Sequence, residues 1–401
     1  MSRSEAPRRP GRSLLQLPGP TNVPDEVLRA IAAPTIDHRG KAFAGIATSV
    51  LADVKPLFGT TGPIALYPGS GTGGWEAALV NTLCPGDRVV VCENGYFAAG
   101  WARLAGKLGL DVGILAGEWN RPPDPERLGE ILRADAAHQI AAVLAVHNET
   151  STGIVADIAA IRRAIDSASH PALLLVDAVS SLGAMPVNHD GWSADVTVTA
   201  SQKGLMLPPG LVLLAVSDKA RAAKRTSSLA VGYWDWEPML AATGTGSFPY
   251  TPATNLVVGL RAAMDRILEE GVDEVFARHR RLAAAVRSAV EGWGLALLCV
   301  DPSAYSDSVT AVVLPEGATD AKVKAALLER WAVTIGGGLG RLAGGCLRIG
   351  HLGDVDELMI ISALAAMEME LPWQSIPVRP GGVQAAMQVL GAAPIDSALP
   401  A

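Results

Sequence analysis

The sequence predicts an α/β fold: a large domain with a mostly parallel central sheet flanked by helices, followed by a smaller α+β C-terminal domain. Between residues 43 and 272, short apolar runs alternate with longer amphipathic stretches. This alternation is typical of parallel strands joined by helices that cover both faces of the sheet. Beyond residue 272 the pattern restarts with shorter strands and longer helices. With 49% apolar residues among 401, the chain can fill cores of that size.

The large domain is expected to span residues 25–272, after an N-terminal arm of residues 1–24 that is rich in proline and glycine. A short helix is expected first, at 25–33, because Pro24 precedes it and Pro34 stops it. The apolar runs predict strands at 64–67, 88–93, 111–115, 140–147, 172–179, 196–200 and 211–216. The amphipathic stretches predict helices at 73–83, 97–108, 125–135, 157–168 and 252–270.

The small domain is expected to span residues 273–370, and a C-terminal tail of residues 371–401 follows it. Helices are expected in the small domain at 273–293, 319–331 and 354–370, with strands at 295–300, 310–315 and 331–335. The tail is rich in proline and glycine but contains one short apolar piece. We therefore expect the tail to pack on the surface or on a partner subunit.

Charge and cysteine content exclude several classes of protein. A net charge of −7 gives no basic surface for nucleic acid or an anionic membrane, so small molecules and further copies of the chain are the expected partners. No run of about 18 apolar residues could span a bilayer, and the N-terminus lacks the apolar segment of a secretion signal. The four cysteines and the histidines lack metal-ligand spacing, so we expect no metal and a cytoplasmic protein with reduced thiols.

A lysine and an aspartate stand at the ends of two predicted strands. Asp177 lies near the end of the run 172–179, and Lys203 follows the run 196–200. α/β folds place their sites at the carboxyl ends of such strands. A lysine amine can form an imine with an aldehyde, and a carboxylate can keep a pyridine nitrogen protonated. Together they predict a pyridoxal phosphate site, whereas Asp177 alone could cap a loop and Lys203 alone could be a solvated residue.

A glycine-rich loop, PGSGTGGW, leads from a short predicted strand into a helix. Ser70 and Thr72 offer hydroxyls there, and the N–H groups of a helix start attract a phosphate. Gly69, Gly71 and Gly74 also spell the dinucleotide pattern G-x-G-x-x-G, so a NAD-dependent oxidoreductase is an alternative. The short, proline-broken strand and its distance from the N-terminus count against that alternative. A plain glycine turn is the third interpretation.

An arginine, Arg348, lies in the strand-like stretch CLRIG, where an unpaired charge would be costly. Its planar guanidinium suits the α-carboxylate of a substrate. An ion pair with Asp354 or Asp356 is the alternative that the sequence leaves open.

In combination these motifs resemble the class V aminotransferases, a family of fold-type I pyridoxal-phosphate enzymes, and within it the serine–glyoxylate and alanine–glyoxylate members most. The likeness covers essentially residues 17–370. It runs in order through LPGPTNVP, DHRG, PGSGTGGWEAALVN, VHNETSTG, LLLVDAVSSLG, SQKGLMLPPG, FPYTP, GGLG and LRIGHLG. The ordered pair of VDAVSS and SQKG is the specific part, and it favours a phosphate cup over a dinucleotide loop.

The resemblance implies that Lys203 carries pyridoxal 5'-phosphate as an imine and that Asp177 holds its pyridine nitrogen. The other cofactor contacts that it implies are Ser70, Gly71, Thr72 and Gln202 at the phosphate, Phe97 and Val179 at the ring faces, and Ser151 at the ring hydroxyl. Arg348 is implied to hold the substrate carboxylate.

The resemblance also implies a homodimer with shared active sites. Thr251 would reach the phosphate in the other subunit. His38 and Arg39 fall where some members have a Tyr-Arg pair that enters the neighbouring site, and the histidine leaves the choice of amino donor open.

The implied activity is transamination from a small L-amino acid, with L-serine expected, to the 2-oxo acid glyoxylate, giving hydroxypyruvate and glycine. Alanine, aspartate or ureidoglycine as donor are alternatives within the family. A lyase or a desulfurase is a more distant one, and the lack of a suitable mobile-loop cysteine disfavours the desulfurase. From other classes, the NAD-dependent oxidoreductase and a catalytically silent binding protein remain, although Lys203, Asp177 and Arg348 disfavour the latter.

Overall fold

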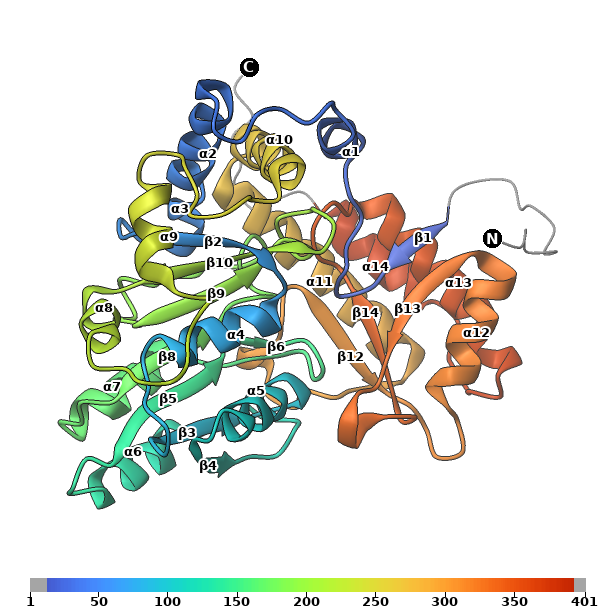
Figure 1. The fold of residues 1–401 in the computed structure, drawn as a ribbon. Coiled ribbons are helices and arrows are strands. Elements are labelled where there is room, and N and C mark those ends of the chain that lie inside the picture. The colour runs from blue at the N-terminus through green and yellow to red at the C-terminus, as the bar shows by residue number, and fades with distance from the viewer. Residues whose placement is uncertain (1–12, 393–401) are drawn as a thin grey trace.

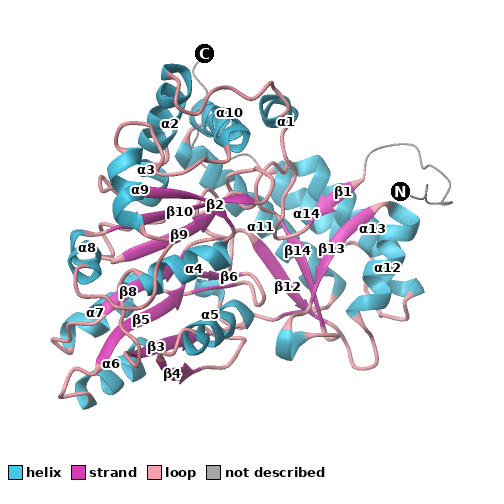
Figure 2. Ribbon diagram, in the orientation of Figure 1, coloured by secondary structure: helices cyan, strands magenta, loops and turns pink. Residues whose placement is uncertain are grey.

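The described residues form two large sheets, each covered by helices, that lie beside each other, and one small two-stranded sheet (Figure 1). A computed structural model describes residues 13–392, so the first twelve residues of the predicted arm and residues 393–401 of the predicted tail lie outside the described residues. Figure 2 separates the strands of the two sheets from the helices around them. The predicted α/β fold with a mostly parallel central sheet is confirmed.

The larger sheet has the strand order β2-β10-β9-β8-β5-β3-β4. Its strands are β2 (Ile64–Gly69), β3 (Arg88–Glu93), β4 (Asp111–Ala116), β5 (Ile140–Val146), β8 (Leu173–Asp177), β9 (Val196–Ala200) and β10 (Gly210–Val216). β10 runs antiparallel to both neighbours, whereas β8 is parallel to β5 and to β9. β9 and β10 are antiparallel because a loop without a helix joins them. That loop carries Gln202 and Lys203.

Alternate residues of these strands bury opposite faces of the sheet. Val89 and Val91 pack into the cluster that contains α4 (Gly71–Val80) and α5 (Tyr96–Lys107), whereas Val90 and Cys92 pack into the cluster that contains α6 (Pro125–Ala134) and α7 (Ile158–Ser167). Burying one such side chain contributes about 1.5–3 kcal/mol. The helices over these faces are α4 (Gly71–Val80), α5 (Tyr96–Lys107), α6 (Pro125–Ala134), α7 (Ile158–Ser167), α8 (Asp218–Lys224) and α9 (Trp236–Thr243).

A further group of helices covers β2 and β10. They are α1 (Asp25–Ile31), α2 (Lys41–Asp53), α3 (Lys55–Phe58) and α10 (Thr254–Glu270). The sequence patterns predicted α1 and α10 but not α2, α3, α8 or α9. The small hairpin of β6 (Asn148–Glu149) and β7 (Ile154–Val155) follows β5 at the carboxyl end of the sheet.

The smaller sheet has the order β1-β13-β14-β12-β11. Its strands are β1 (Leu14–Gln16), β11 (Ala296–Leu297), β12 (Val309–Val313), β13 (Val333–Gly337) and β14 (Cys346–Gly350), with 3-10 turns at Pro302–Ala304 and Gly340–Leu342. Its helices are α11 (Val272–Trp293), α12 (Asp320–Trp331), α13 (Glu357–Trp373) and α14 (Gly382–Gly391). The predicted strand at 295–300 is shorter than expected because the chain leaves the sheet where Val300 N–H bonds to Asn120 O.

The N-terminal segment contributes a strand that the sequence does not predict. Leu14 pairs with Val333 in parallel register, so β1 joins the sheet of the small domain. Gln16 is buried there, and its Nε2 donates to Gly350 O at 2.5 Å. The division of the chain at residue 272 stays a prediction, although α11 begins at that residue.

The described part of the tail packs against its own chain. α14 lies against α11 and α13 (Figure 1). Among residues 13–392, no helix combines the length and the apolar character needed to cross a membrane.

Candidate active site

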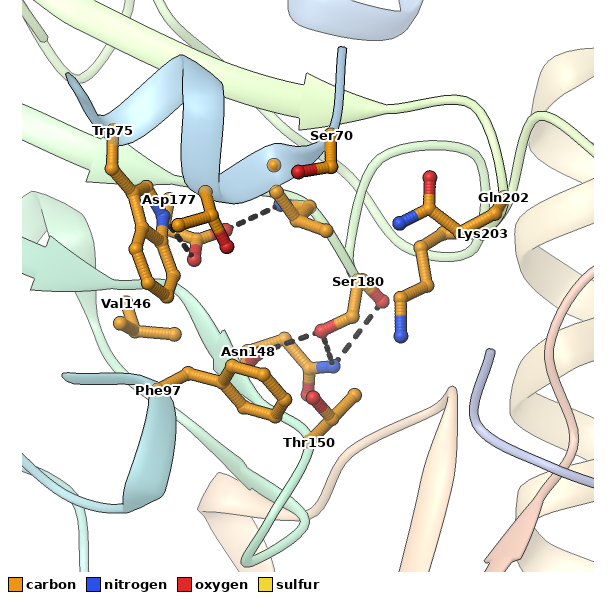
Figure 3. Close-up of a pocket in the computed structure, with 13 residues that line it drawn as sticks. Ser70, Trp75, Phe97, Val146, Asn148, Thr150, Asp177, Ser180, Gln202 and Lys203 are labelled. Carbon is orange, nitrogen blue, oxygen red and sulfur yellow. Dashed lines mark hydrogen bonds between the residues drawn. The ribbon is translucent and has the colours of Figure 1, made fainter. Parts of the chain in front are cut away.

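A cavity lies at the carboxyl ends of β5, β8 and β9 (Figure 3). Asp177 and Lys203 both line it, so the two strand-end residues that the sequence singles out face one common space. Figure 3 shows the Lys203 amine extending into the cavity from the side opposite Trp75 and Asp177. The predicted cofactor contacts that line the cavity are Ser70, Gly71, Thr72, Phe97, Asp177, Val179, Gln202 and Lys203.

Asp177 is the last residue of β8, and it is only 4% exposed. Its Oδ1 accepts a hydrogen bond from Val179 N–H at 2.7 Å, and its Oδ2 accepts one from Trp75 Nε1 at 2.9 Å. Burial raises the pKa of Asp177 to about 7, although both hydrogen bonds act in the opposite direction. The ionised form of such a buried carboxylate is stabilised by a cationic hydrogen-bond donor in the same cavity, such as a protonated pyridine nitrogen.

The Lys203 amine lies in the loop between β9 and β10 and is buried. Its Nζ donates to the carbonyl oxygen of Pro18 at 2.6 Å, and Gly19 follows so closely that a side chain at that position would collide with the amine. Burial lowers the pKa of Lys203 to about 8, and the nearby Arg348 guanidinium acts in the same direction. A substantial fraction of this amine is therefore neutral and nucleophilic near pH 8.

The start of α4 forms a cradle in the cavity wall. Ser70 is its N-cap residue with extended backbone, and its hydroxyl makes no capping hydrogen bond. Gly71 lies so close to Val179 that a Cβ at residue 71 would come within 2.8 Å of Cγ2 of that valine. The absent side chain thus leaves room for a ligand at the free N–H groups of a helix start, which suits a phosphate.

The dinucleotide alternative is not supported by this arrangement. A dinucleotide site also needs an acidic residue about 20 positions after the glycines, which here is Glu93 at the end of β3, and it would have to reach the ligand from the strand beside β2. In the sheet, β3 is separated from β2 by four strands. The Glu93 carboxylate instead accepts from Trp119 Nε1 at 3.1 Å and pairs with Arg341 at 2.8 Å.

The Arg348 side chain lies beside the cavity rather than in its wall. Its Nε donates to Gly337 O at 2.7 Å, and its NH1 donates at 3.1 Å to the carbonyl oxygen of Thr150, which does line the cavity. The alternative ion pairs are not formed: Asp354 pairs with another arginine, Arg266, and Asp356 caps α13. Burial lowers the pKa of Arg348.

Ser151 does not lie where the resemblance implies. It is absent from the cavity wall, and its hydroxyl donates to Glu149 Oε1 at 2.6 Å while it accepts from Tyr96 N–H at 2.9 Å. Asn148 and Thr150 line the cavity instead. They are alternate residues in the extended segment after β5, and alternate residues of an extended segment face the same side. This alternation was the signal in the sequence that could have predicted both residues.

Two buried side-chain oxygens in the wall lack a protein partner. Asn148 Nδ2 donates to Ser180 O at 3.2 Å, to Ser180 Oγ at 2.8 Å and to Ser308 Oγ at 2.7 Å, which fixes the orientation of its amide. Asn148 Oδ1 and Gln202 Oε1 find no hydrogen-bond partner among the described residues. Buried polar atoms are nearly always bonded, so these two point to a polar ligand.

Thr251, His38 and Arg39 do not line the cavity of this chain. Thr251 and Arg39 are exposed, and His38 is half-buried. The two segments that carry these residues lie together, since Asn255 Nδ2 donates to Ala33 O at 2.9 Å.

Sequence reasoning missed several residues of the wall: Trp75, Val146, Asn148, Thr150 and Ser180. Trp75 follows Gly71 by one helical turn, and residues at this spacing share a helix face. That spacing could have predicted an indole beside the cradle.

The residues present fit pyridoxal phosphate. A helix start can take the phosphate, a buried carboxylate can take the ring nitrogen, and a buried amine can take the aldehyde. Phe97 and Val179 line the cavity on different elements, α5 and the loop after β8. This fold and this set of groups define the class of pyridoxal-phosphate enzymes.

Comparison with known proteins resolves the family. The aminotransferase class-V family matches residues 14–341 of the chain. The chain belongs to this family and is a pyridoxal-phosphate-dependent aminotransferase. It is 46% identical to the serine–glyoxylate aminotransferase of Methylorubrum extorquens, over 98% of this chain and 100% of that protein.

Two further relatives show the breadth of the family. The L-aspartate–glyoxylate aminotransferase of Paracoccus denitrificans is 45% identical over 93% of this chain and 94% of its own. The crystal structure of ureidoglycine–glyoxylate aminotransferase from Bacillus subtilis is 27% identical and superposes with a TM-score of 0.87, over 96% of this chain and 99% of that chain.

Proposed function

We propose that the enzyme transfers the amino group of L-serine to glyoxylate and releases hydroxypyruvate and glycine. The observation that carries this proposal is the 46% identity to a serine–glyoxylate aminotransferase along the whole length of that protein. Aspartate is the second candidate donor, because an L-aspartate–glyoxylate aminotransferase is nearly as similar.

Each of three residues would act at a stated atom. When bound, pyridoxal phosphate supplies an aldehyde that accepts amines and a ring that takes up electrons. Lys203 Nζ would bond to the aldehyde carbon and, once the donor amine displaces it, would take the α-proton of the donor. Asp177 would hold the proton on the pyridine nitrogen. The Arg348 guanidinium would bind the carboxylate of each substrate in turn.

The remaining wall residues would orient the cofactor. The cradle of Ser70, Gly71 and Thr72, with Gln202 beside it, would hold the phosphate. Phe97 and Val179 would contact the two faces of the ring. We assign the group at the ring hydroxyl to Thr150 rather than to Ser151, because Thr150 lies in the cavity wall.

We further propose a homodimer in which Thr251, His38 and Arg39 complete the site of the partner subunit. Mixing two inactive variants tests this. A hybrid of Lys203→Ala and Arg39→Ala subunits would contain one site with both lesions and one with neither, so subunit exchange should restore activity. No recovery from a mixture of exchanged subunits would place Arg39 and Lys203 of one chain in one site.

The four cysteines, all free, support the expected cytoplasmic location.

Two measurements test the reaction. The purified protein should hold pyridoxal phosphate, and borohydride should fix the cofactor on Lys203; the Lys203→Ala variant should show no fixation and turnover lower by about a thousandfold or more. A panel of serine, alanine, aspartate and ureidoglycine with glyoxylate should give the highest kcat/KM with serine. A higher kcat/KM with aspartate would identify aspartate, not serine, as the donor. Absence of turnover with every donor would overturn the proposal.

A further inference from the structure

The indole of Trp75 and the carboxylate of Asp177 meet across two elements. Trp75 lies in α4 and Asp177 ends β8, and Nε1 donates to Oδ2 at 2.9 Å. Figure 3 shows this hydrogen bond at the edge of the cavity that both residues line. Both side chains are buried, Trp75 being 6% exposed. A hydrogen bond to a charged group is stronger than one between neutral groups, so this contact is a strong constraint on the carboxylate.

The indole ring is held in place by neighbouring aromatic rings. It stacks on Trp101 with centroids 5.8 Å apart and an interplanar angle of 15°. It also meets Phe97 edge-on, at 6.4 Å and 66°. A ring packed in this way has little freedom to rotate, so its N–H points in one direction.

The carboxylate is thus held at both oxygens. Val179 N–H binds Oδ1 from two residues further along the same chain segment, and Trp75 binds Oδ2 from another element. With one oxygen fixed locally, the second hydrogen bond sets the plane of the carboxylate. Without the Trp75 N–H, Oδ2 would be buried with one hydrogen-bond donor fewer, which is unfavourable for a buried acceptor.

We propose that Trp75 is a positioning residue, whose indole N–H holds the Asp177 carboxylate in the plane from which it meets the ring nitrogen of the cofactor. This inference rests on the proposed function. Under this inference the indole N–H affects the contact between Asp177 and the ring nitrogen and no other contact of the cofactor. Trp236 in α9 provides the contrast, because it is fully buried but its Nε1 has no partner among residues 13–392.

The test compares two cofactors on each variant. Apoenzyme prepared from the holoenzyme is titrated with pyridoxal phosphate and with the deaza analogue, in which C–H replaces the ring nitrogen. In wild type, the ratio of the two dissociation constants measures the interaction of Asp177 with the nitrogen. The Trp75→Phe variant should bind pyridoxal phosphate about tenfold more weakly and the deaza analogue within about twofold of wild type. The matched control, Trp236→Phe, should leave the ratio unchanged.

A second pair of variants guards against a failure of Trp75→Phe to fold. Trp75→Gln keeps an N–H donor without the ring, and Trp75→Leu keeps neither. The glutamine variant should preserve more of the preference for pyridoxal phosphate over the deaza analogue than the leucine variant. Equal losses for both cofactors, or equal ratios in these two variants, would reduce Trp75 to a packing residue and overturn the inference. A wild-type enzyme without preference between the cofactors would remove the proposed role of Asp177 and this inference with it.

Discussion

Lys203 Nζ donates its hydrogen bond to the backbone carbonyl of Pro18, not to a carboxylate. The loop that contains Pro18 lies alongside the loop that contains Lys203. Thr21 N–H donates to Gln202 O at 3.2 Å, and Thr21 Oγ1 donates to Lys203 O at 3.2 Å. The amine is therefore covered by neutral backbone. Such an environment removes water from the ammonium form without supplying a counterion in contact with it.

The first prediction concerns the pH dependence of this amine. Because burial lowers the pKa of Lys203 to about 8, the amine is protonated and unreactive below that pH and neutral above it. The rate at which apoenzyme takes up pyridoxal phosphate into a borohydride-reducible bond should rise tenfold per pH unit below about pH 7 and level off above about pH 9. A rate that keeps rising to pH 10 would contradict this, because it would indicate an ordinary lysine.

The second prediction concerns the cradle at the start of α4. Gly71→Ala would bring a Cβ within 2.8 Å of Val179 Cγ2, so one of the two elements must shift and phosphate binding should weaken by about tenfold or more. The double variant Gly71→Ala, Val179→Ala should recover part of the cofactor affinity, measured by titration of apoenzyme. As a control, Gly45→Ala in α2 has open space around the new methyl and should be neutral or stabilising by about 0.5–1 kcal/mol. Absence of any recovery in the double variant would show that the collision with Val179 is not the cause.

The third prediction concerns the substrate carboxylate. Arg348→Lys keeps the charge but loses the planar fork, so KM for donor and acceptor should both rise by about ten- to a hundredfold. Cofactor affinity should change little, because Arg348 does not line the cofactor cavity. Steady-state kinetics with both substrates varied checks the change, and an altered KM for only one substrate would mean that the two carboxylates bind at different groups.

The fourth prediction concerns Glu149, which is fully buried. Its Oε2 accepts from Phe97 N–H and Ala98 N–H, both at 3.0 Å, and so caps α5, whose own N-cap residue is Gly95. Glu149→Ala should reduce the free energy of unfolding by about 2–4 kcal/mol, because these donors would be buried without partners. Glu149→Gln should cost less, since its carbonyl oxygen can still accept from the helix.

The control for Glu149 is an exposed cap of the same kind. Asp124 accepts from Glu126 N–H at the start of α6, and Asp124→Ala should cost about 1 kcal/mol. Urea denaturation of the apoenzymes compares the variants. Equal losses for Glu149→Ala and Asp124→Ala would show that burial adds nothing to the cap.

The sequence located the reactive pair because the signal is local. Lys203 and Asp177 each follow or end an apolar strand, and the carboxyl ends of parallel strands converge. The rest of the wall depends on contacts between distant segments. Trp75 reaches Asp177 from another element, and no local pattern reports which strand-end carboxylate an indole will meet. The choice of Thr150 over Ser151 depends on how the hairpin after β5 turns, which shifts the facing residue by one position.

The fold shows the same limit. Apolar periodicity predicted the strands of the large sheet, but the direction of β10 depends on the lack of a helix after β9, and β1 depends on a partner at the other end of the chain. The three-residue β1 carries too little local pattern to be recognised without β13. The roles assigned to Thr251, His38 and Arg39 stay predictions because they concern a second subunit.

The pairing of Leu14 with Val333 has a consequence for synthesis on the ribosome. The chain emerges N-terminus first, so β1 has no partner until β13 has been translated. Residues 17–21, which cover Lys203, follow β1 directly; Thr21 ties one end of this segment to the lysine loop, and the pairing of β1 with β13 ties the other end. The segment over the amine would thus gain its second anchor only late in translation, and a chain that stops before β13 would hold its catalytic lysine under a segment tied at one end.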